Sequence, residues 1–99
     1  MSIKSTVTND GKTLHVAMSG RFDFNCVQDF RKAYADRDKY ESYEVDLRDV
    51  DHIDSSALGM LLNMRKYCGE SVEIRVTNSK PAIKKILLIS RFDKKFRID

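Results

Sequence analysis

Long hydrophobic segments are missing from this sequence. The longest apolar runs, such as Ile86 to Ile89, extend over only a few residues, whereas a helix that spans a bilayer needs about 20. Residues 1–10 also contain no apolar run, so no secretory signal peptide is expected. These absences argue against a membrane-spanning or membrane-bound protein and predict a soluble protein of the cytoplasm.

Cysteine is scarce, and the two that occur, Cys26 and Cys68, lie far apart in the sequence. They form no CxxC motif, and no spacing typical of a metal site links them. We expect both to be reduced, partly buried thiols in a reducing compartment. The sequence therefore predicts neither a metal site nor a cofactor.

A strong excess of one charge is missing too. The formal net charge of +3 is too small to indicate nucleic-acid binding by itself, and the two signs are mixed along most of the chain. Basic residues gather only in residues 91–97, which we interpret as a solvated tail. We expect Phe92 and Phe96 in this tail to anchor a helix and not to contact bases. No nucleic-acid partner is predicted.

The residues that are present suit a single globular domain. Of the 99 residues, 41% are hydrophobic and 33% are charged, a balance typical of globular and not of disordered chains. A chain of this length has room for one core. Because we find no internal repeat, low-complexity segment or linker, residues 1–99 are expected to form one domain.

Four segments alternate apolar with polar residues, which is the period of a β-strand. They are residues 3–8, 14–18, 43–47 and 72–76. The turn signal Asn9-Asp10-Gly11 joins the first two into a hairpin, because these residues tolerate positive φ. Gly20 is expected to end the second strand, and the aspartate-rich residues 48–54 are expected to form a loop.

Three further segments show the spacing of three and four residues that is typical of helices. The first runs to about residue 37, the second covers about 55–68, and the third about 80–90. Their expected inner faces consist of Val27, Phe30, Ala33 and Tyr34, then Leu58, Leu61, Leu62 and Arg65, and then Ile83, Ile86 and Leu87. The order β-β-α-β-α-β-α predicts an α/β fold with a mixed four-stranded sheet and one layer of about three helices.

The helix ends carry recognisable capping residues. Asp23 or Asn25 is expected to cap the first helix, and Ser79 the third, with Pro81 in its first turn. Gly69 is expected to stop the second helix, since glycine adopts the left-handed conformation common at helix C-termini.

Two serines stand at the start of the second helix, within Asp54-Ser55-Ser56-Ala57-Leu58-Gly59, which follows the strand Val45-Asp46-Leu47. Backbone N–H groups there lack intrahelical partners and the helix dipole favours an anion. A phosphate added to either serine would therefore be stabilised. Serine is also a common N-cap residue, so the local pattern is compatible with both roles.

This segment resembles the signature of the STAS domain, as found in bacterial anti-sigma factor antagonists. The family typically shows Asp-Ser-Ser or Asp-Ser-Thr, then Gly, an aliphatic residue and Gly. Gly20-Arg21-Phe22-Asp23 resembles the family's Gly-x-hydrophobic-Asp corner after the second strand, and the order of elements agrees over most of the chain. Ala57 departs from the pattern, because the family usually has glycine there.

The resemblance implies a regulator that switches partners. The unmodified protein would bind an anti-sigma factor or related regulator, a serine kinase would phosphorylate it and release it, and a PP2C-type serine phosphatase would reset it. Ser56 is the expected acceptor and Ser55 the second choice, with Asp23 beside it and Asp54 fixing the loop. The expected partner-binding residues are Asp23, Asp54, Ser55, Ser56, Ala57, Leu58 and Gly59.

Two other functions are alternatives to this one, and the first is an enzyme. His52 lies close in sequence to the two serines, but no nucleophile elbow or oxyanion-hole motif accompanies it, so we do not expect catalysis. STAS-like domains also serve as accessory subunits of transporters or sensory complexes without phospho-switching. The lack of a membrane segment argues only against a fused transporter.

Overall fold

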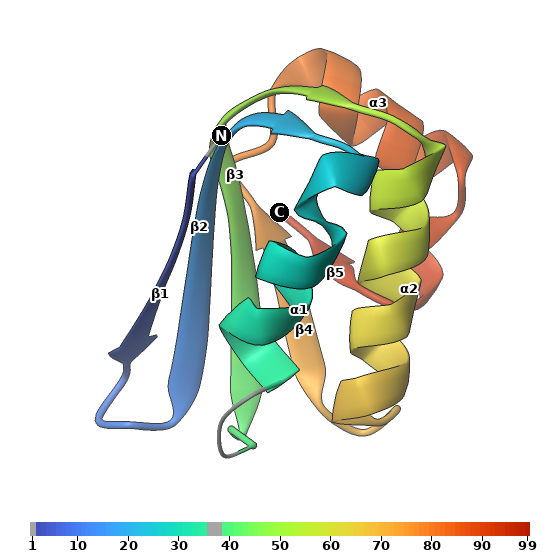
Figure 1. The fold of residues 1–99 in the computed structure, drawn as a ribbon. Coiled ribbons are helices and arrows are strands. Elements are labelled where there is room, and N and C mark those ends of the chain that lie inside the picture. The colour runs from blue at the N-terminus through green and yellow to red at the C-terminus, as the bar shows by residue number, and fades with distance from the viewer. Residues whose placement is uncertain (1, 36–38) are drawn as a thin grey trace.

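Five strands form one mixed sheet in the computed structural model, which describes residues 2–35 and 39–99 (Figure 1). The strands β1 (Ser2–Thr8) and β2 (Thr13–Phe22) form the antiparallel hairpin. β3 (Ser42–Ile53), β4 (Glu73–Thr77) and β5 (Arg97–Ile98) follow in order, each parallel to its neighbour. The predicted α/β fold is confirmed, with a fifth strand in place of the expected four.

Three helices cover one face of this sheet. They are α1 (Val27–Ala35), α2 (Ser55–Cys68) and α3 (Pro81–Ile89), and Figure 1 shows α1 and α2 side by side over the strands. Consecutive parallel strands joined by right-handed crossovers place their helices on the same side. Two short 3₁₀ helices, η1 (Phe24–Cys26) and η2 (Phe92–Lys94), precede α1 and follow α3. The predicted end of the first helix, near residue 37, lies outside the described residues.

The core fills the space between the helices and the sheet. Alternate strand residues are buried, among them Leu14, Val16, Val45, Leu47, Ile74 and Val76. Burial of a side chain of this size contributes roughly 1.5–3 kcal/mol. The expected inner faces are correct in part: Leu61, Phe30 and Leu87 are buried, whereas Val27, Leu62 and Ile86 are more than 40% exposed. These three lie just outside the apolar stripe of their helices.

β2 and β3 run further than their sequence patterns predict. Gly20 lies within β2, and residues 48–53 continue β3, so the predicted strand end and loop are wrong. The pairing of β2 with β3 shifts register between Ala17 and Ser19 and again between Gly20 and Arg21. Such irregularities insert residues and break the period of two, which explains why the pattern conceals this extension.

The hairpin turn and the end of α2 follow the expected chemistry, whereas the start of α3 does not. Asn9, Asp10 and Gly11 have φ values of 57°, 56° and 84°, as the hairpin turn requires. Gly69 ends α2 with φ 94°, and its N–H donates to the Arg65 carbonyl oxygen at 2.9 Å. The expected cap at Ser79 is wrong, because α3 begins one residue later, after Lys80.

The C-terminal segment is folded onto the domain and is not the predicted solvated tail. Phe92 and Phe96 are buried, as expected of anchoring residues, and their rings stack with centroids 5.6 Å apart. Arg65, only 6% exposed, donates to the carbonyl oxygens of Gly69, Val72 and Lys95. Its guanidinium also lies 5.3 Å from the centre of the Phe96 ring. These contacts hold the segment in place so that β5 can join the sheet.

Both cysteines are free, and their side chains are more deeply buried than expected. Burial raises the pKa of the Cys68 thiol above its usual value, because a thiolate would lose its hydration there. Within the described residues, no helix has both the length and the apolar character needed to cross a membrane.

Candidate functional site

The carboxyl ends of β2 and β3 bring the two sequence motifs together. Phe22 pairs with Ile53 in the parallel register, so Asp23 and Asp54 are the next residues at the same edge of the sheet. This edge lies at the top of Figure 1, where α2 begins. Ligand and partner sites of α/β sheets commonly form at such an edge.

Asp54 is the N-cap of α2, in the extended conformation with φ −127°. Its Oδ1 accepts a hydrogen bond from the Ala57 N–H at 3.2 Å. Of the two roles compatible with the serine pattern, capping is therefore excluded, because the Asp54 carboxylate takes it. Asp54 thereby holds the chain at the point where β3 turns directly into α2, in place of the loop that the sequence predicted.

The carboxylate cap leaves both serine side chains free of a capping role. In the part of the chain that the structure describes, neither the Ser55 nor the Ser56 hydroxyl makes a hydrogen bond to another protein group. Ser55 is exposed and Ser56 is half-buried. The first turn itself contains no acidic residue, so the Asp54 carboxylate before it is the negative group at the positive end of the helix dipole.

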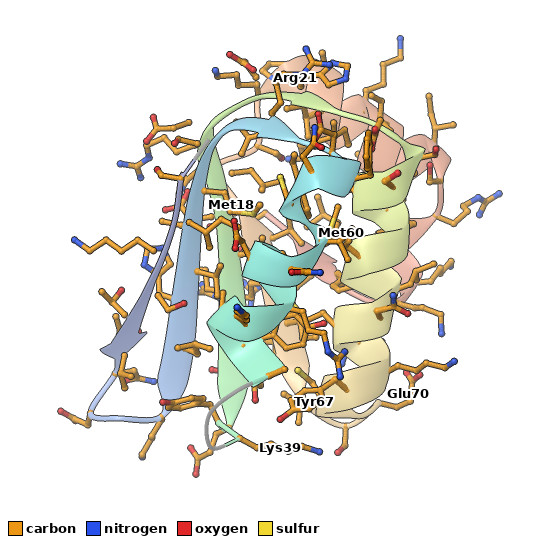
Figure 2. All side chains as sticks on the ribbon, viewed as in Figure 1. Met18, Arg21, Lys39, Met60, Tyr67 and Glu70 are labelled. Atoms are coloured by element: carbon orange, nitrogen blue, oxygen red, sulfur yellow. The ribbon has the colours of Figure 1, made fainter. Side chains whose placement is uncertain are left out.

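Asp23 is the capping residue after β2, as Asp54 is after β3. It caps η1, where its Oδ1 accepts from the Asn25 N–H at 3.0 Å. Its Oδ2 lies 3.5 Å from Nε of Arg21, which Figure 2 labels at this end of the strand. The Asp23 side chain is only 13% exposed, so it mainly stabilises the connection between β2 and η1.

The remaining predicted residues differ in what they offer a partner. Ala57 is completely buried, so its methyl group packs in the core and presents no surface. Leu58 is half-buried and Gly59 is exposed. A Cβ built at Gly59 would have no neighbouring atom within 4 Å. The surface side of this turn is therefore formed by Ser55, Ser56 and Gly59, and it carries little side-chain bulk.

Two exposed apolar residues lie beside this site, one of which the sequence analysis did not single out. Phe24, directly after Asp23, is 65% exposed, and Val27, which was expected to face the core, is 46% exposed. With Asn25, Gln28 and Asp29 they line a shallow hollow of about 380 Å³. The signal in the sequence is that Phe30 and Tyr34 alone complete the buried stripe of α1, which leaves Phe24 without a place in the core.

The described residues do not join His52 to either serine. Among the described residues, His52 makes no hydrogen bond to Ser55 or Ser56, although a nucleophilic serine requires a base within about 3 Å. Figure 2 places Met60, one turn after Ser56, between α1 and α2, where it is buried. An apolar side chain occupies that position, so α2 supplies no acid or base there.

Comparison with known proteins gives a consistent answer. Residues 5–98 match the sequence family described as "Mlab, STAS domain". A STAS-domain containing protein of Pseudomonas aeruginosa (strain UCBPP-PA14) is 45% identical over 101 residues, which is 99% of this chain and 99% of that protein.

Solved structures show the same fold at lower identity. An anti-sigma factor antagonist from Mycobacterium paratuberculosis has a TM-score of 0.77 and 23% identity, over 98% of this chain and 85% of that chain. The anti-sigma factor antagonist SpoIIAA in its unphosphorylated form gives 0.70 and 14%, over 99% and 87%. The Bacillus cell fate determinant SpoIIAA in the phosphorylated form gives 0.74 and 16%, over 99% and 91%.

Proposed function

We propose that this chain, which belongs to the STAS domain family, is an anti-sigma factor antagonist. In this proposal it changes partners when Ser56 is phosphorylated. The unmodified form binds an anti-sigma factor or a related regulator in the cytoplasm. A serine kinase transfers the γ-phosphoryl group of ATP to the Ser56 hydroxyl, and the complex dissociates. A PP2C-type phosphatase hydrolyses the phosphoserine and restores the binding form.

The observation that carries this proposal is the cap of α2. Because Asp54 satisfies the Ala57 N–H, the hydroxyl groups at the start of the helix are available for modification. The amides of the first turn and the helix dipole stabilise an added phosphate. Ser56 is preferred over Ser55 because of its position in the family motif, although Ser55 is the more exposed of the two.

The partner surface we propose consists of Asp23, Phe24, Ser56, Leu58 and Gly59. Phe24 supplies an exposed aromatic ring of the kind that dominates binding energy at interfaces. Gly59 has open space around it and allows a partner backbone to approach α2 closely. A phosphate on Ser56 adds a charge of between about −1.5 and −2, which is costly in a desolvated interface that supplies no cation.

Release of the partner does not require the fold to change. SpoIIAA has been solved both without and with its phosphate, and this chain superposes on both forms. The amides at the start of α2 can accommodate the anion locally. The switch we propose is therefore exclusion of the partner from an unchanged surface.

The acceptor is tested by incubation with the cognate kinase and ATP. We expect one phosphate per chain, abolished in Ser56→Ala and retained in Ser55→Ala, which is the matched control. Mass-spectrometric mapping of the phosphate to Ser55, or to neither serine, would contradict the assignment.

The switch is tested by capturing the partner with the unmodified chain and titrating it calorimetrically. The phosphorylated chain should bind at least tenfold more weakly, which is about 1.4 kcal/mol. Ser56→Asp should bind more weakly by a smaller factor, and Ser56→Ala should bind constitutively. Equal affinities for the phosphorylated and unmodified forms would contradict the switch and favour an accessory subunit of a transporter or sensory complex. Thermal melts of each form separate loss of contact from loss of fold.

The surface is tested with two exposed apolar residues. Phe24→Ala should weaken partner binding by at least about tenfold, as for a typical interface hot spot. Ile89→Ala is the control, because Ile89 is 70% exposed but lies at the end of α3. Equal effects of the two substitutions would show that the partner does not bind beside η1.

A further inference from the structure

The face of the sheet that is not covered by helices carries polar side chains at alternate positions. His15 of β2 alternates with the buried residues Leu14 and Val16, and Glu44 and Asp46 flank the buried Val45 in β3. The parallel register pairs His15 with Glu44 and Ala17 with Asp46. Three potential ligands from neighbouring strands therefore point away from the helices and toward one another.

Their donor atoms are close enough to share one ion. Nε2 of His15 lies 3.0 Å from Oδ2 of Asp46 and 3.8 Å from Oε2 of Glu44. One ligand atom from each of the three residues falls within a group whose members are all within 4.8 Å. In a tetrahedral zinc site with metal–ligand distances of about 2.0–2.1 Å, the ligand atoms are roughly 3.4 Å apart. The observed separations bracket this value.

Other residues hold the two carboxylates in this orientation. Arg75 Nη2 donates to Glu44 Oε1 at 2.7 Å, and the Thr77 hydroxyl donates to Glu44 Oε2 at 2.8 Å. Asp46 Oδ1 accepts from the backbone N–H of Arg48 at 3.0 Å and from Asn78 Nδ2 at 3.1 Å. The Arg75 guanidinium thus takes one oxygen of Glu44 and leaves the other beside the imidazole. Outer hydrogen bonds of this kind orient the ligands of metal sites.

The electrostatic setting also suits a cation. The side chains of His15, Glu44 and Asp46 are 25%, 19% and 14% exposed, so they are partly desolvated and still reachable from solution. Two carboxylates beside one imidazole give the cluster mainly anionic oxygen ligands, which favour a cation.

We propose that His15, Glu44 and Asp46 form a binding site for a divalent transition-metal ion of the zinc type, with water completing the coordination. A single imidazole with two carboxylates selects such ions over magnesium or calcium, which prefer oxygen ligands alone. The ion links β2 to β3 on the face opposite the helices. This site does not depend on the function proposed for Ser56. The sequence analysis did not predict this site, because its ligands come from two strands and meet only in the folded sheet.

The test is calorimetric titration of the metal-free protein with Zn²⁺, together with the visible absorption spectrum of the Co²⁺ form. We expect one ion per chain and a melting temperature that rises with Zn²⁺ concentration. His15→Ala should weaken binding by more than about 100-fold, since loss of a ligand should exceed the 10- to 100-fold effect of an outer partner. His52→Ala removes the only other histidine and should leave the affinity unchanged.

Asn78→Ala provides a second variant that keeps all three ligands. It removes the hydrogen bond to Asp46 Oδ1 and should weaken Zn²⁺ binding by roughly tenfold or more, even if His15→Ala fails to fold. The proposal is overturned if no stoichiometric binding is found, if Asn78→Ala binds as tightly as the native chain, or if Mg²⁺ competes equally with Zn²⁺. If no stoichiometric binding is found, the three side chains form a hydrogen-bonded cluster that holds no ion.

Discussion

The helices α2 and α3 both follow a parallel strand, yet their first turns are built differently. At α2 the Asp54 carboxylate accepts from the Ala57 N–H, and two serines occupy the first helical positions. At α3 the cap residue is Lys80, which makes no side-chain hydrogen bond, and Pro81 occupies the first turn. Proline lacks an N–H and so removes one of the unpaired donors. Of these two helix starts, that of α2 combines unpaired amides with modifiable hydroxyl groups.

The two helices also differ in how firmly they are packed. α2 buries Ala57, Met60, Leu61, Met64, Arg65 and Cys68, whereas α3 buries only Ile83 and Leu87. α3 leaves Ile86, Leu88 and Ile89 between 41% and 70% exposed. A charge added at the start of α2 therefore meets a helix that its core contacts hold in place. This is the property required of a switch that acts without unfolding.

The largest difference between the helices should appear in the core. Leu61→Ala should lower the free energy of unfolding by roughly 2–5 kcal/mol, because Leu61 is 1% exposed and its loss leaves a cavity. Ile86→Ala in α3 should cost less than about 1 kcal/mol, since that side chain is 41% exposed. Urea unfolding of both variants gives the comparison, and equal losses would show that α3 is as tightly packed as α2.

The caps should differ by a smaller amount. Asp54→Ala should destabilise the protein by about 1 kcal/mol, since it removes the side-chain acceptor of the Ala57 N–H. Lys80→Ala removes no cap bond and should change stability by less than about 0.5 kcal/mol. Chemical denaturation at neutral pH measures both. A Lys80→Ala loss as large as that of Asp54→Ala would refute the contrast between the two helix starts.

The glycine of α2 should show a gain in stability. Gly59→Ala should raise the free energy of unfolding by up to about 1 kcal/mol, because alanine is the better helix former and its Cβ meets no atom within 4 Å. If Gly59 is retained for contact with a partner, the same variant should bind that partner more weakly. Thermal melts and the calorimetric titration together decide this, and a destabilised Gly59→Ala would contradict the open space seen around the residue.

The smallest effect is expected at Ser79, before α3. Its Oγ is buried and has no hydrogen-bond partner among the described residues. Ser79→Ala should therefore change stability by less than about 0.5 kcal/mol or raise it slightly, because it removes a polar atom that is not compensated. A loss of 1 kcal/mol or more in urea unfolding would show that this hydroxyl acts as a cap after all.

Sequence patterns predicted the parts of the fold whose periods are undisturbed. The hairpin around Asn9-Asp10-Gly11, the start of α2 and its end at Gly69 are all confirmed. The sequence pattern predicts a loop at residues 48–53, where β3 in fact continues. Register shifts break the alternation there, and the exposed positions are charged. β5 has only two residues, too few to show any period, and it forms through pairing with β4.

The candidate site was predictable only as far as it lies in one short segment. Asp54 and the two serines are visible as a motif, but which of them caps α2 depends on the conformation of the turn. The sequence did not predict that Phe24 is exposed, because the exposure of an aromatic side chain depends on how the whole core packs. Strand pairing brings His15 close to Glu44 and Asp46, and no local spacing in the sequence reveals such a contact.

The buried guanidinium of Arg65 has a consequence for the order in which this domain is completed during synthesis. One of its acceptors, the Lys95 carbonyl, is 30 residues further along the chain. At a translation rate of about 5–20 residues per second, this acceptor is made roughly 1.5–6 s after Arg65. Until then the guanidinium has only its nearby acceptors, the carbonyl oxygens of Gly69 and Val72. The same last residues add β5 to β4, so the third acceptor and the final strand are completed together.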